Sequence, residues 1–452
     1  MKKSFLVFIF ALAASLLHAA ERKPNVVILL ADDLRPDGLH ALGNPTVQTP
    51  HLDSLVSRGF IFRHAYTMGS MVGAVCLPSR TMLLTGQSMF HAANEASSGP
   101  DALTFPRAMR EAGYAAIHSG KFGNSPRKIT NEFDETYDAG HSDQDADKVI
   151  DFIGRTGGKK PLFIYYAPHE PHDPQFATEE FYAKYRPEDM PLPAAFSPFH
   201  PFNNGAMTIR DENTLPWPRT NANVSHKLAR YCASTSYYDA QVGRILATLR
   251  ATGQFDNTIF IIAGDNGLSL GEHGLLGKQN LYEFGGMHVP LTFAGQGIAR
   301  GETRALAYLM DIFPTVCELT GTATPNRVEG RSLAPVMRNE VPRVREYLHT
   351  AYAKVQRAIR DERWKLIRYP EIDKTQLFDL QTDPHEMNDL SAQPGSAERI
   401  KALTAQLEQA QHAVDDPVPL TVPNPGPAEW SPALLTPKNI EAQEKETKIN
   451  GN

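Results

Sequence analysis

Three short apolar runs, each ending abruptly in polar residues, place the strongest constraint on the fold of this chain. They span residues 25–31, 162–167 and 258–263. They are too short for ordinary helices and show no polar alternation, which is typical of strands buried on both faces of a parallel sheet. Helix-like periodic segments lie between them, at 103–112 and 229–252 among others. We therefore predict an α/β fold with a large, mostly parallel central sheet flanked by helices.

The polar residues that follow these runs predict a single site. Asp32 and Asp33 follow the first run, residues 169–172 follow the second, and Asp265 and Asn266 follow the third. Ligands of open α/β sheets bind beyond the carboxyl ends of the strands. Three carboxylates held together there would repel one another unless a cation lay among them, and oxygen ligands favour calcium or magnesium over zinc. Either pair alone could instead cap a loop or a helix.

The C-terminal third has a different pattern. After Pro342, short alternating runs separated by turn residues predict a small antiparallel sheet, and residues 397–414 have the spacing of a helix. The last segment is rich in proline and then in lysine and glutamate, which predicts an extended or disordered tail. We therefore expect a catalytic domain over 21–342, an antiparallel subdomain over 343–415 and a tail over 416–452.

The N-terminus has the pattern of a cleaved signal peptide over residues 1–20. Lys2 and Lys3 precede an apolar stretch at 5–17, and Ala19 and Ala20 follow it. A stretch this short does not span a bilayer comfortably, so we expect no stable membrane anchor. The interpretation is a secreted or periplasmic protein.

Charge and cysteine content narrow the class of function. The formal net charge of the 452 residues is −6, with acids and bases interspersed, which argues against nucleic acid as a partner. The three cysteines, Cys76, Cys232 and Cys317, are too few for a disulfide scaffold and odd in number. One thiol therefore needs another explanation, and Cys76 alone begins a motif.

That motif is Cys76-Leu77-Pro78-Ser79-Arg80, followed by Leu-Leu-Thr-Gly at 83–86. Pro78 suits the first turn of a helix, which would place Cys76 at a helix N-terminus, although an isolated cysteine is more often a small buried hydrophobe. The motif resembles the one at which type I sulfatases have their cysteine oxidised to formylglycine. The resemblance extends from about Pro24 to Leu390 and implies an alkaline-phosphatase-like fold.

The resemblance also implies the cofactors and the sulfate contacts. One Ca²⁺ would be held by Asp32, Asp33, Asp265, Asn266 and the modified Cys76. The sequence around Gly120-Lys121, and Lys278 downstream of Asp265, are similar to family elements whose lysines contact the sulfate, and Arg80 would orient the nucleophile.

One family position differs in this chain. Gly123 stands where the family element Gly-Lys-x-His has its histidine. Asn124 occupies the place where some members, including the iduronate sulfatase branch, carry that histidine, and His118 is a weaker substitute. The group that deprotonates the second hydroxyl of the nucleophile is therefore open.

A further histidine would act as the general acid. His169 and His172 both fit the family pattern of a histidine two residues before proline, and we favour His172. The resemblance implies that a formylglycine hydrate attacks sulfur, that this histidine protonates the departing alkoxide, and that the sulfated hydrate then expels sulfate.

The predicted function is hydrolysis of sulfate esters on a sulfated polysaccharide or oligosaccharide, after maturation by a formylglycine-generating enzyme. Aromatic residues in the insertion over 175–220 suggest a wall for a sugar ring, although ordinary loop packing explains them equally well: Tyr182, Tyr185, Phe199, Phe202 and Trp217. Two alternatives stay open: a formylglycine-dependent phosphonate or phosphodiester hydrolase, and an inactive sulfated-glycan binding protein.

Overall fold

The computed structural model describes residues 22–95 and 103–449. Its centre is an eight-stranded sheet with the order β5-β4-β6-β1-β7-β8-β2-β9. β1 lies between β6 and β7 and is parallel to both, whereas β8 is antiparallel to β7 and to β2. The strand bounds are Asn25–Ala31 (β1), Phe60–Tyr66 (β2), Ala115–Gly120 (β4), Glu135–Tyr137 (β5), Leu162–Ala167 (β6), Thr258–Gly264 (β7), His288–Gly295 (β8) and Gly301–Tyr308 (β9). The predicted signal peptide lies outside the described residues.

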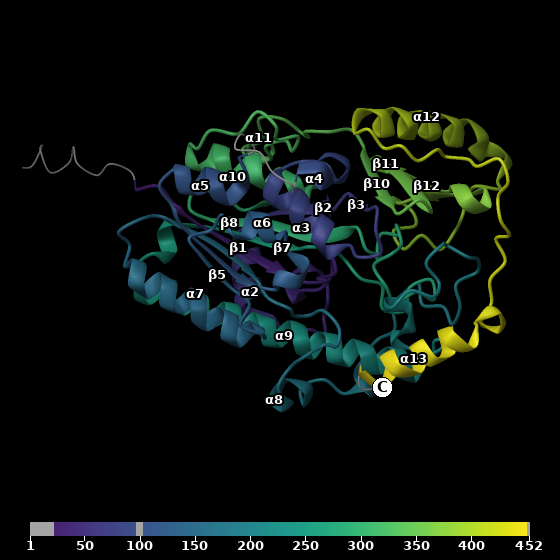
Figure 1. Cartoon of the computed structure of the whole chain (residues 1–452), viewed down its shortest axis with the longest axis horizontal. Coiled ribbons are helices and arrows are strands. Elements are labelled where there is room, and N and C mark those ends of the chain that lie inside the picture. Colours follow the sequence, from purple (N-terminus) through teal and green to yellow (C-terminus); the bar gives the residue numbers. More distant parts are fainter. Residues whose placement is uncertain (1–21, 96–102, 450–452) are drawn as a thin grey trace, which may run out of the picture.

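Helices cover both faces of this sheet (Figure 1). One face packs against α3 (Cys76–Thr85), α5 (Phe105–Glu111) and α10 (Ile312–Thr320). The other packs against α2 (Pro50–Val56), α7 (Ser142–Thr156) and the long α9 (Asn221–Ala251). Short helices fill the connections: α4 (Met89–Glu95), α6 (Arg127–Thr130), α8 (Glu179–Tyr182) and α11 (Ala334–Met337). The predicted α/β architecture is confirmed.

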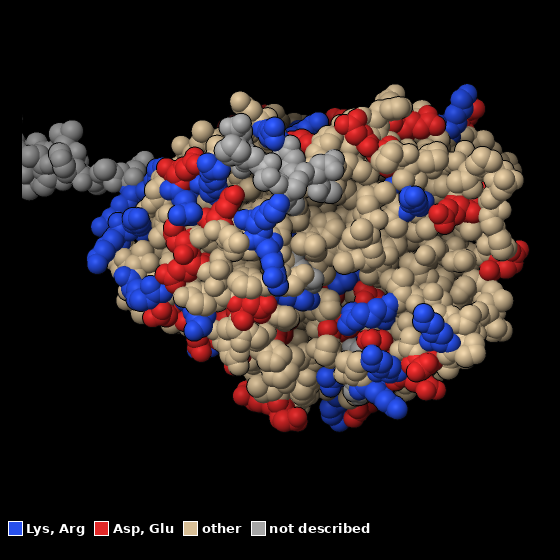
Figure 2. All heavy atoms as spheres, viewed as in Figure 1, with Lys and Arg blue, Asp and Glu red and all other residues tan. Residues whose placement is uncertain are grey.

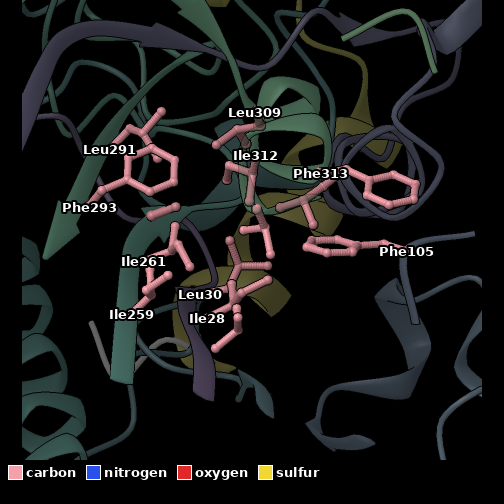
Figure 3. Packing of buried hydrophobic residues seen from close by; sticks show 14 of the residues in the cluster. Ile28, Leu30, Phe105, Ile259, Ile261, Leu291, Phe293, Leu309, Ile312 and Phe313 are labelled. Carbon is pink, nitrogen blue, oxygen red and sulfur yellow. The ribbon is translucent and has the colours of Figure 1, made fainter. Parts of the chain in front are cut away.

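The side chains of β1 explain why its sequence is apolar throughout. Ile28 and Leu30 join the core on one face, where Phe105 stacks on Phe313 at a centroid distance of 4.5 Å (Figure 3). Val27 and Leu29 join the core on the other face. Successive side chains of a strand point to opposite faces, so a strand covered on both faces is stabilised by a continuous apolar run.

The predicted C-terminal sheet and helix are also present. β10 (Leu348–Tyr352), β11 (Gln356–Arg360), β12 (Trp364–Tyr369) and β13 (Lys374–Asp379) form an antiparallel meander. The short β3 (Gly69–Ser70) pairs in parallel with β10 and joins this sheet to the segment that leads to Cys76. Leu403 and Leu407 of α12 (Ala397–Ala413) pack on one face of this sheet. The pairing of β3 with β10 fixes the position of the sheet relative to the start of α3.

The C-terminal tail packs against the rest of the molecule, which the sequence did not predict. It runs from α12 along the outer edge of the molecule and ends in α13 (Pro437–Ile449) beside the 211–215 segment (Figure 1). Trp430 packs edge-on against Trp217 at 4.7 Å, and the Gln443 amide donates to the Leu215 carbonyl at 3.1 Å. The expectation of an extended or disordered end is therefore wrong for 437–449. Glutamate, lysine, glutamine and alanine form helices readily, and these docking contacts hold this one in place.

The face of the molecule seen in Figure 2 carries charges of both signs. Among the described residues, no helix combines the length and apolar character that crossing a membrane requires. Figure 2 shows lysines and arginines interspersed with acids over the visible face.

Candidate active site

Four strands deliver their carboxyl ends to one edge of the sheet. β1 leads into Asp32, β7 into Asp265, β4 into Lys121 and β6 into the histidine loop at 169–172. Backbone hydrogen bonds continue between these loops, from Asp265 N to Ala31 O at 3.1 Å and from Lys121 N to Ala167 O at 3.0 Å. The predicted convergence of the polar clusters is thus seen in the structure.

Gly120 allows one of these loops to pass close to its neighbour. Its φ of +139° is unfavourable for other residues, and a Cβ there would lie 2.0 Å from the Ala167 carbonyl oxygen. The glycine therefore brings the Lys121 backbone against the end of β6.

Cys76 is the first residue of α3 and is buried among charged groups. Its Sγ lies 3.1 Å from Asp32 Oδ1, 3.6 Å from Asp33 Oδ1 and 3.1 Å from Lys278 Nζ. Burial and the negative charges of Asp265 and Asp32 raise the pKa of this thiol well above its usual value. These groups of the protein therefore disfavour a thiolate at Cys76.

The side chain of Arg80 contacts two of the carboxylates. Its buried guanidinium bridges Asp265 Oδ2, at 2.8 Å from Nε, and Asp32 Oδ2, at 3.2 Å from Nη2. Burial raises the pKa of Asp265 to about 6, and the charge of Asp32 adds to this effect. Burial acts in the same direction on Asp32, but Lys121 and Arg80 outweigh it and hold that pKa well below its ordinary value. Arg80 is therefore a positioning residue for the carboxylates.

The donor set fits a hard divalent cation. Single ligand atoms of Asp32, Asp33, Cys76 and His172 lie within 4.8 Å of one another. Asn266 Oδ1 is buried and has no hydrogen-bond partner among the described residues, as expected of an oxygen that could bind a cation. Asn266 itself donates to Asp33. Carboxylate and amide oxygens are ligands that suit Ca²⁺ or Mg²⁺.

Two lysines bring positive charge to Cys76. Lys278 Nζ contacts both Asp33 oxygens, at 2.6 and 2.9 Å, and Lys121 Nζ lies 2.8 Å from Asp32 Oδ2. Despite burial, the charges of Asp33 and Cys76 raise the pKa of Lys278 well above its usual value. Lys278 therefore stays charged beside Cys76, and Lys121 lies against the neighbouring Asp32.

The structure places the candidate histidines in different surroundings. His172 Nε2 lies 3.7 Å from Asp33 Oδ2, inside the cluster, while His169 Nε2 contacts Asp138 at 3.2 Å and its side chain is 38% exposed. His118 is buried beside Tyr165, and burial lowers its pKa to about 3, so it is a neutral core residue. The side chain of Asn124 lies outside the described set.

A neighbouring residue that the sequence did not single out positions His172. The ring's Nδ1 lies 2.6 Å from the Asp173 carbonyl oxygen and 3.4 Å from Asp173 Oδ1. A carbonyl only accepts, so Nδ1 carries a proton and Nε2 faces the cluster. Adjacency to the His-x-Pro pattern is the signal that could have indicated Asp173.

A cavity of about 550 Å³ opens from these residues. Lys121, His169 and His172 line one part of it, and Tyr182 and Arg230 line another. Of the predicted aromatic wall, Tyr182 lies here, whereas Tyr185 is buried against α9 and Phe199 and Phe202 line a separate groove. The insertion over 175–220 thus contributes to the cavity chiefly through its first residues, 175–182.

Comparison with known protein families agrees with this geometry. The family model described as Sulfatase matches residues 24–322, which include every residue of the cluster. The chain belongs to the sulfatase family. A second model, N-sulphoglucosamine sulphohydrolase, C-terminal, matches residues 271–413 and covers the meander and α12.

Relatives extend the match to most of this sulfatase. It is 24% identical to an N-acetylglucosamine-6-O-sulfatase of Bacteroides thetaiotaomicron over 87% of each chain. It is 29% identical to a choline-sulfatase of Rhizobium meliloti over 85% of each chain. The predicted family and enzyme class, a sulfuric ester hydrolase, are confirmed at this level.

Solved structures confirm the fold. One, a complex with its substrate D-glucosamine-2-N,6-O-disulfate, superposes with a TM-score of 0.74 at 22% identity, covering 88% of this chain and 99% of the other. A phosphonate monoester hydrolase from Silicibacter pomeroyi superposes with a TM-score of 0.71 at 22% identity, covering 87% and 96%. The alkaline-phosphatase-like fold is shared by both.

Proposed function

We propose that this sulfatase removes sulfate from a sulfated carbohydrate, with Cys76 oxidised to formylglycine as the source of the nucleophile. The single observation that carries the proposal is the buried cluster around Cys76, in which two carboxylates and Lys278 contact its Sγ. Similarity to the N-acetylglucosamine-6-O-sulfatase supports a carbohydrate substrate.

Four side chains near Cys76 are suited to binding a divalent cation. Asp32, Asp33, Asp265 and Asn266 would hold Ca²⁺, which would polarise the nucleophile and neutralise charge on sulfate oxygens. Arg80 keeps Asp32 and Asp265 in place by the contacts described above. The oxidised Cys76 would supply an oxygen nucleophile at neutral pH.

Lys121 and Lys278 stabilise the sulfate. Both ammonium groups border the Cys76 side chain or its carboxylate neighbours and are positioned before substrate arrives. Charges fixed in advance stabilise the transition state more than mobile solvent does, because they need no reorganisation.

His172 protonates the departing oxygen. Its Nδ1 proton is held by the Asp173 carbonyl, so the proton that can be transferred lies on Nε2 of the imidazolium. Asp33 and Asp173 stabilise that positive charge through contacts at 3.7 and 3.4 Å. A sugar alkoxide is a poor leaving group, so this proton matters most for carbohydrate sulfates.

The test combines a mass measurement with a substrate panel. Protein produced with a formylglycine-generating enzyme should contain, at Cys76, a residue that has lost sulfur and gained oxygen. It should release sulfate from glycosaminoglycan, carrageenan, ulvan or fucoidan fragments, while Cys76→Ala should release none and the matched Cys232→Ala should be active.

Three outcomes would contradict the proposal. Faster turnover of phosphate or phosphonate esters than of any sulfate ester would favour the phosphoester alternative. An unmodified thiol on an inactive protein that still binds sulfated glycans would favour the binding-protein alternative. Fast turnover of choline sulfate alone would reject the carbohydrate substrate.

We also propose that the protein is exported to the periplasm or beyond the cell. The N-terminal pattern over 1–20 supports this, and fractionation with N-terminal sequencing tests it. A cytoplasmic protein with an intact N-terminus would contradict it.

A further inference from the structure

The cavity beside Lys121 and His172 has a second cationic side chain, Arg230 of α9. Its guanidinium carbon lies 4.9 Å from the centre of the Tyr182 ring. One terminal nitrogen makes long hydrogen bonds to Gln175 O at 3.3 Å and to Tyr182 Oη at 3.4 Å. These contacts fix the direction of the guanidinium without neutralising its charge.

Arg230 has no anionic partner in the described part of the chain. No described carboxylate lies within the 4.0 Å limit of an ion pair with it, whereas Arg210 of the same region pairs with Asp173 and Asp211. The Arg230 Nε is buried and, among the described residues, has no hydrogen-bond partner. A buried N–H that makes no hydrogen bond costs free energy.

The acids of the cavity wall are already neutralised by other groups. Asp173 is paired with Arg210, and Lys227, buried one turn before Arg230 on α9, adds a second positive charge near it. Glu170 accepts from His141 Nδ1 at 2.9 Å and from the Ser142 amide at 3.0 Å. The positive charge of Arg230 is therefore available to a ligand.

A second buried polar group lies in the same wall. The side chain of Gln175 is fully buried, and neither its amide nitrogen nor its oxygen has a hydrogen-bond partner among the described residues. Gln175 and Arg230, two residues that line this cavity together with Lys121, thus carry three buried polar atoms without a hydrogen bond among the described residues. A cavity of about 550 Å³ has room for more than a sulfate group.

We propose that the substrate is a sulfated sugar with a second anionic group, which binds Arg230 while the scissile sulfate lies at Cys76. The inference rests on the proposed function, since it assigns the part of the substrate beyond the sulfate ester. The second anion is a carboxylate or another sulfate, because a guanidinium pairs with either through two parallel hydrogen bonds. Tyr182 and Phe176 line the same cavity.

Matched substrates and matched variants test the assignment. We would measure kcat and KM of the mature enzyme for a monosulfated hexosamine, its disulfated form, a sulfated uronic acid sugar and 4-nitrophenyl sulfate. The variants are Arg230→Gln, Arg230→Lys as partial rescue, and Arg244→Ala as a control. Arg244 is on α9 too, but pairs with Asp147 on the surface.

We expect the wild-type enzyme to prefer the substrates with a second anion. Arg230→Gln should lower kcat/KM for these by about 10- to 100-fold, mostly through KM, and for the monosulfated sugar by far less. Arg230→Lys should recover part of the loss, and Arg244→Ala should match wild type. The larger loss, with the uronic acid or with the disulfated sugar, identifies the anion as carboxylate or sulfate.

Three results would overturn the inference. The first is a wild-type enzyme with equal kcat/KM for mono- and dianionic sugars, and the second is an equal fall for all four substrates in Arg230→Gln. The third is sulfate release from 4-nitrophenyl sulfate alone, with every sugar untouched. Release from none of the four would instead mean that the proposed function itself has failed.

Discussion

At the residue scale, the two histidines of the β6 loop have different surroundings and therefore different expected roles. His172 lies 3.7 Å from Asp33 Oδ2, and His169 contacts Asp138 at the more exposed edge. We expect His172→Asn to lower kcat for sugar sulfates by about 100-fold or more, the usual contribution of a general acid. The loss on 4-nitrophenyl sulfate should be much smaller, because nitrophenolate leaves without a proton. Steady-state kinetics with both substrates check this.

The matched variant in the same loop is His169→Asn, for which we expect only a few-fold change on either substrate. A larger loss in His169→Asn than in His172→Asn would reverse the assignment. Equal losses on sugar and aryl sulfates in His172→Asn would remove its role as the acid.

Gly123 provides a second test at the residue scale. An ideal Cβ at this position has no heavy atom of the structure within 4 Å, so a larger side chain fits. Because the family resemblance places a proton-accepting histidine here, we expect Gly123→His to raise kcat by about tenfold or more, at an unchanged unfolding temperature. Gly123→Gln, of similar size but unable to accept a proton at neutral pH, is the control. Similar kcat values for both variants and wild type would show that another group does this work.

The position of a candidate site residue was most predictable from the sequence where the residue follows a strand or stands in a motif. Asp32, Asp265 and Lys121 were predictable because a buried strand ends just before each. Arg230 and Gln175 were not, since an arginine within a helix or a glutamine in a loop has no pattern that distinguishes it from a solvated side chain. Their importance depends on whether the groups around them neutralise or satisfy them, and only the tertiary structure determines which groups those are.

At the element scale, the meander and the tail are joined by a buried ion pair. Asp416 accepts from Arg357 Nε at 2.6 Å and Nη2 at 2.9 Å, and from Gln411 at 2.9 Å. Burial disfavours the charged carboxylate, but hydrogen bonds from His349, Arg357 and Gln411 outweigh this and keep the pKa of Asp416 well below its ordinary value. A carboxylate of this kind stabilises the fold above its unfolded pKa and ceases to do so as the pH falls through the folded pKa.

We therefore expect Asp416→Asn to lower the free energy of unfolding by about 3 kcal/mol at pH 7, because it leaves Arg357 buried without its partner. The difference from wild type should persist down to about pH 4 and shrink below it. Denaturant unfolding over a pH series measures this. Glu408→Gln, an exposed acid-to-amide change on α12, is the control. A difference that grows below pH 4 would contradict the assignment.

The elements themselves were more predictable than the tail. Elements marked by a continuous apolar run or by helical periodicity, such as β1 and α12, matched their expected bounds closely. α13 was missed because its Lys/Glu-rich sequence has no apolar stripe to reveal a buried face. It is held instead by contacts that involve distant residues such as Leu215.

At the scale of the whole molecule, the candidate metal ligands follow two adjacent strands, β1 and β7, that lie far apart in the sequence. Asp32 and Asp33 follow β1, and Asp265 and Asn266 follow β7 more than 200 residues later in the chain. A cation bound by all four would stabilise the native state and have little affinity for the unfolded chain, where these ligands are far apart.

We expect saturating Ca²⁺ to raise the unfolding temperature and EDTA to lower it and stop sulfate release. At free Ca²⁺ about 100-fold above Kd, the stabilisation is about 2.7 kcal/mol. Asp33→Asn should unfold at nearly the same temperature with and without Ca²⁺, whereas Asp256→Asn, an exposed acid in the turn before β7, should respond as wild type does. Differential scanning calorimetry with Ca²⁺, Mg²⁺ and EDTA gives the comparison. A wild-type response no larger than that of Asp33→Asn would mean that these oxygens do not bind the ion. The negative charge of the carboxylates would then be balanced by Arg80 and the two lysines alone.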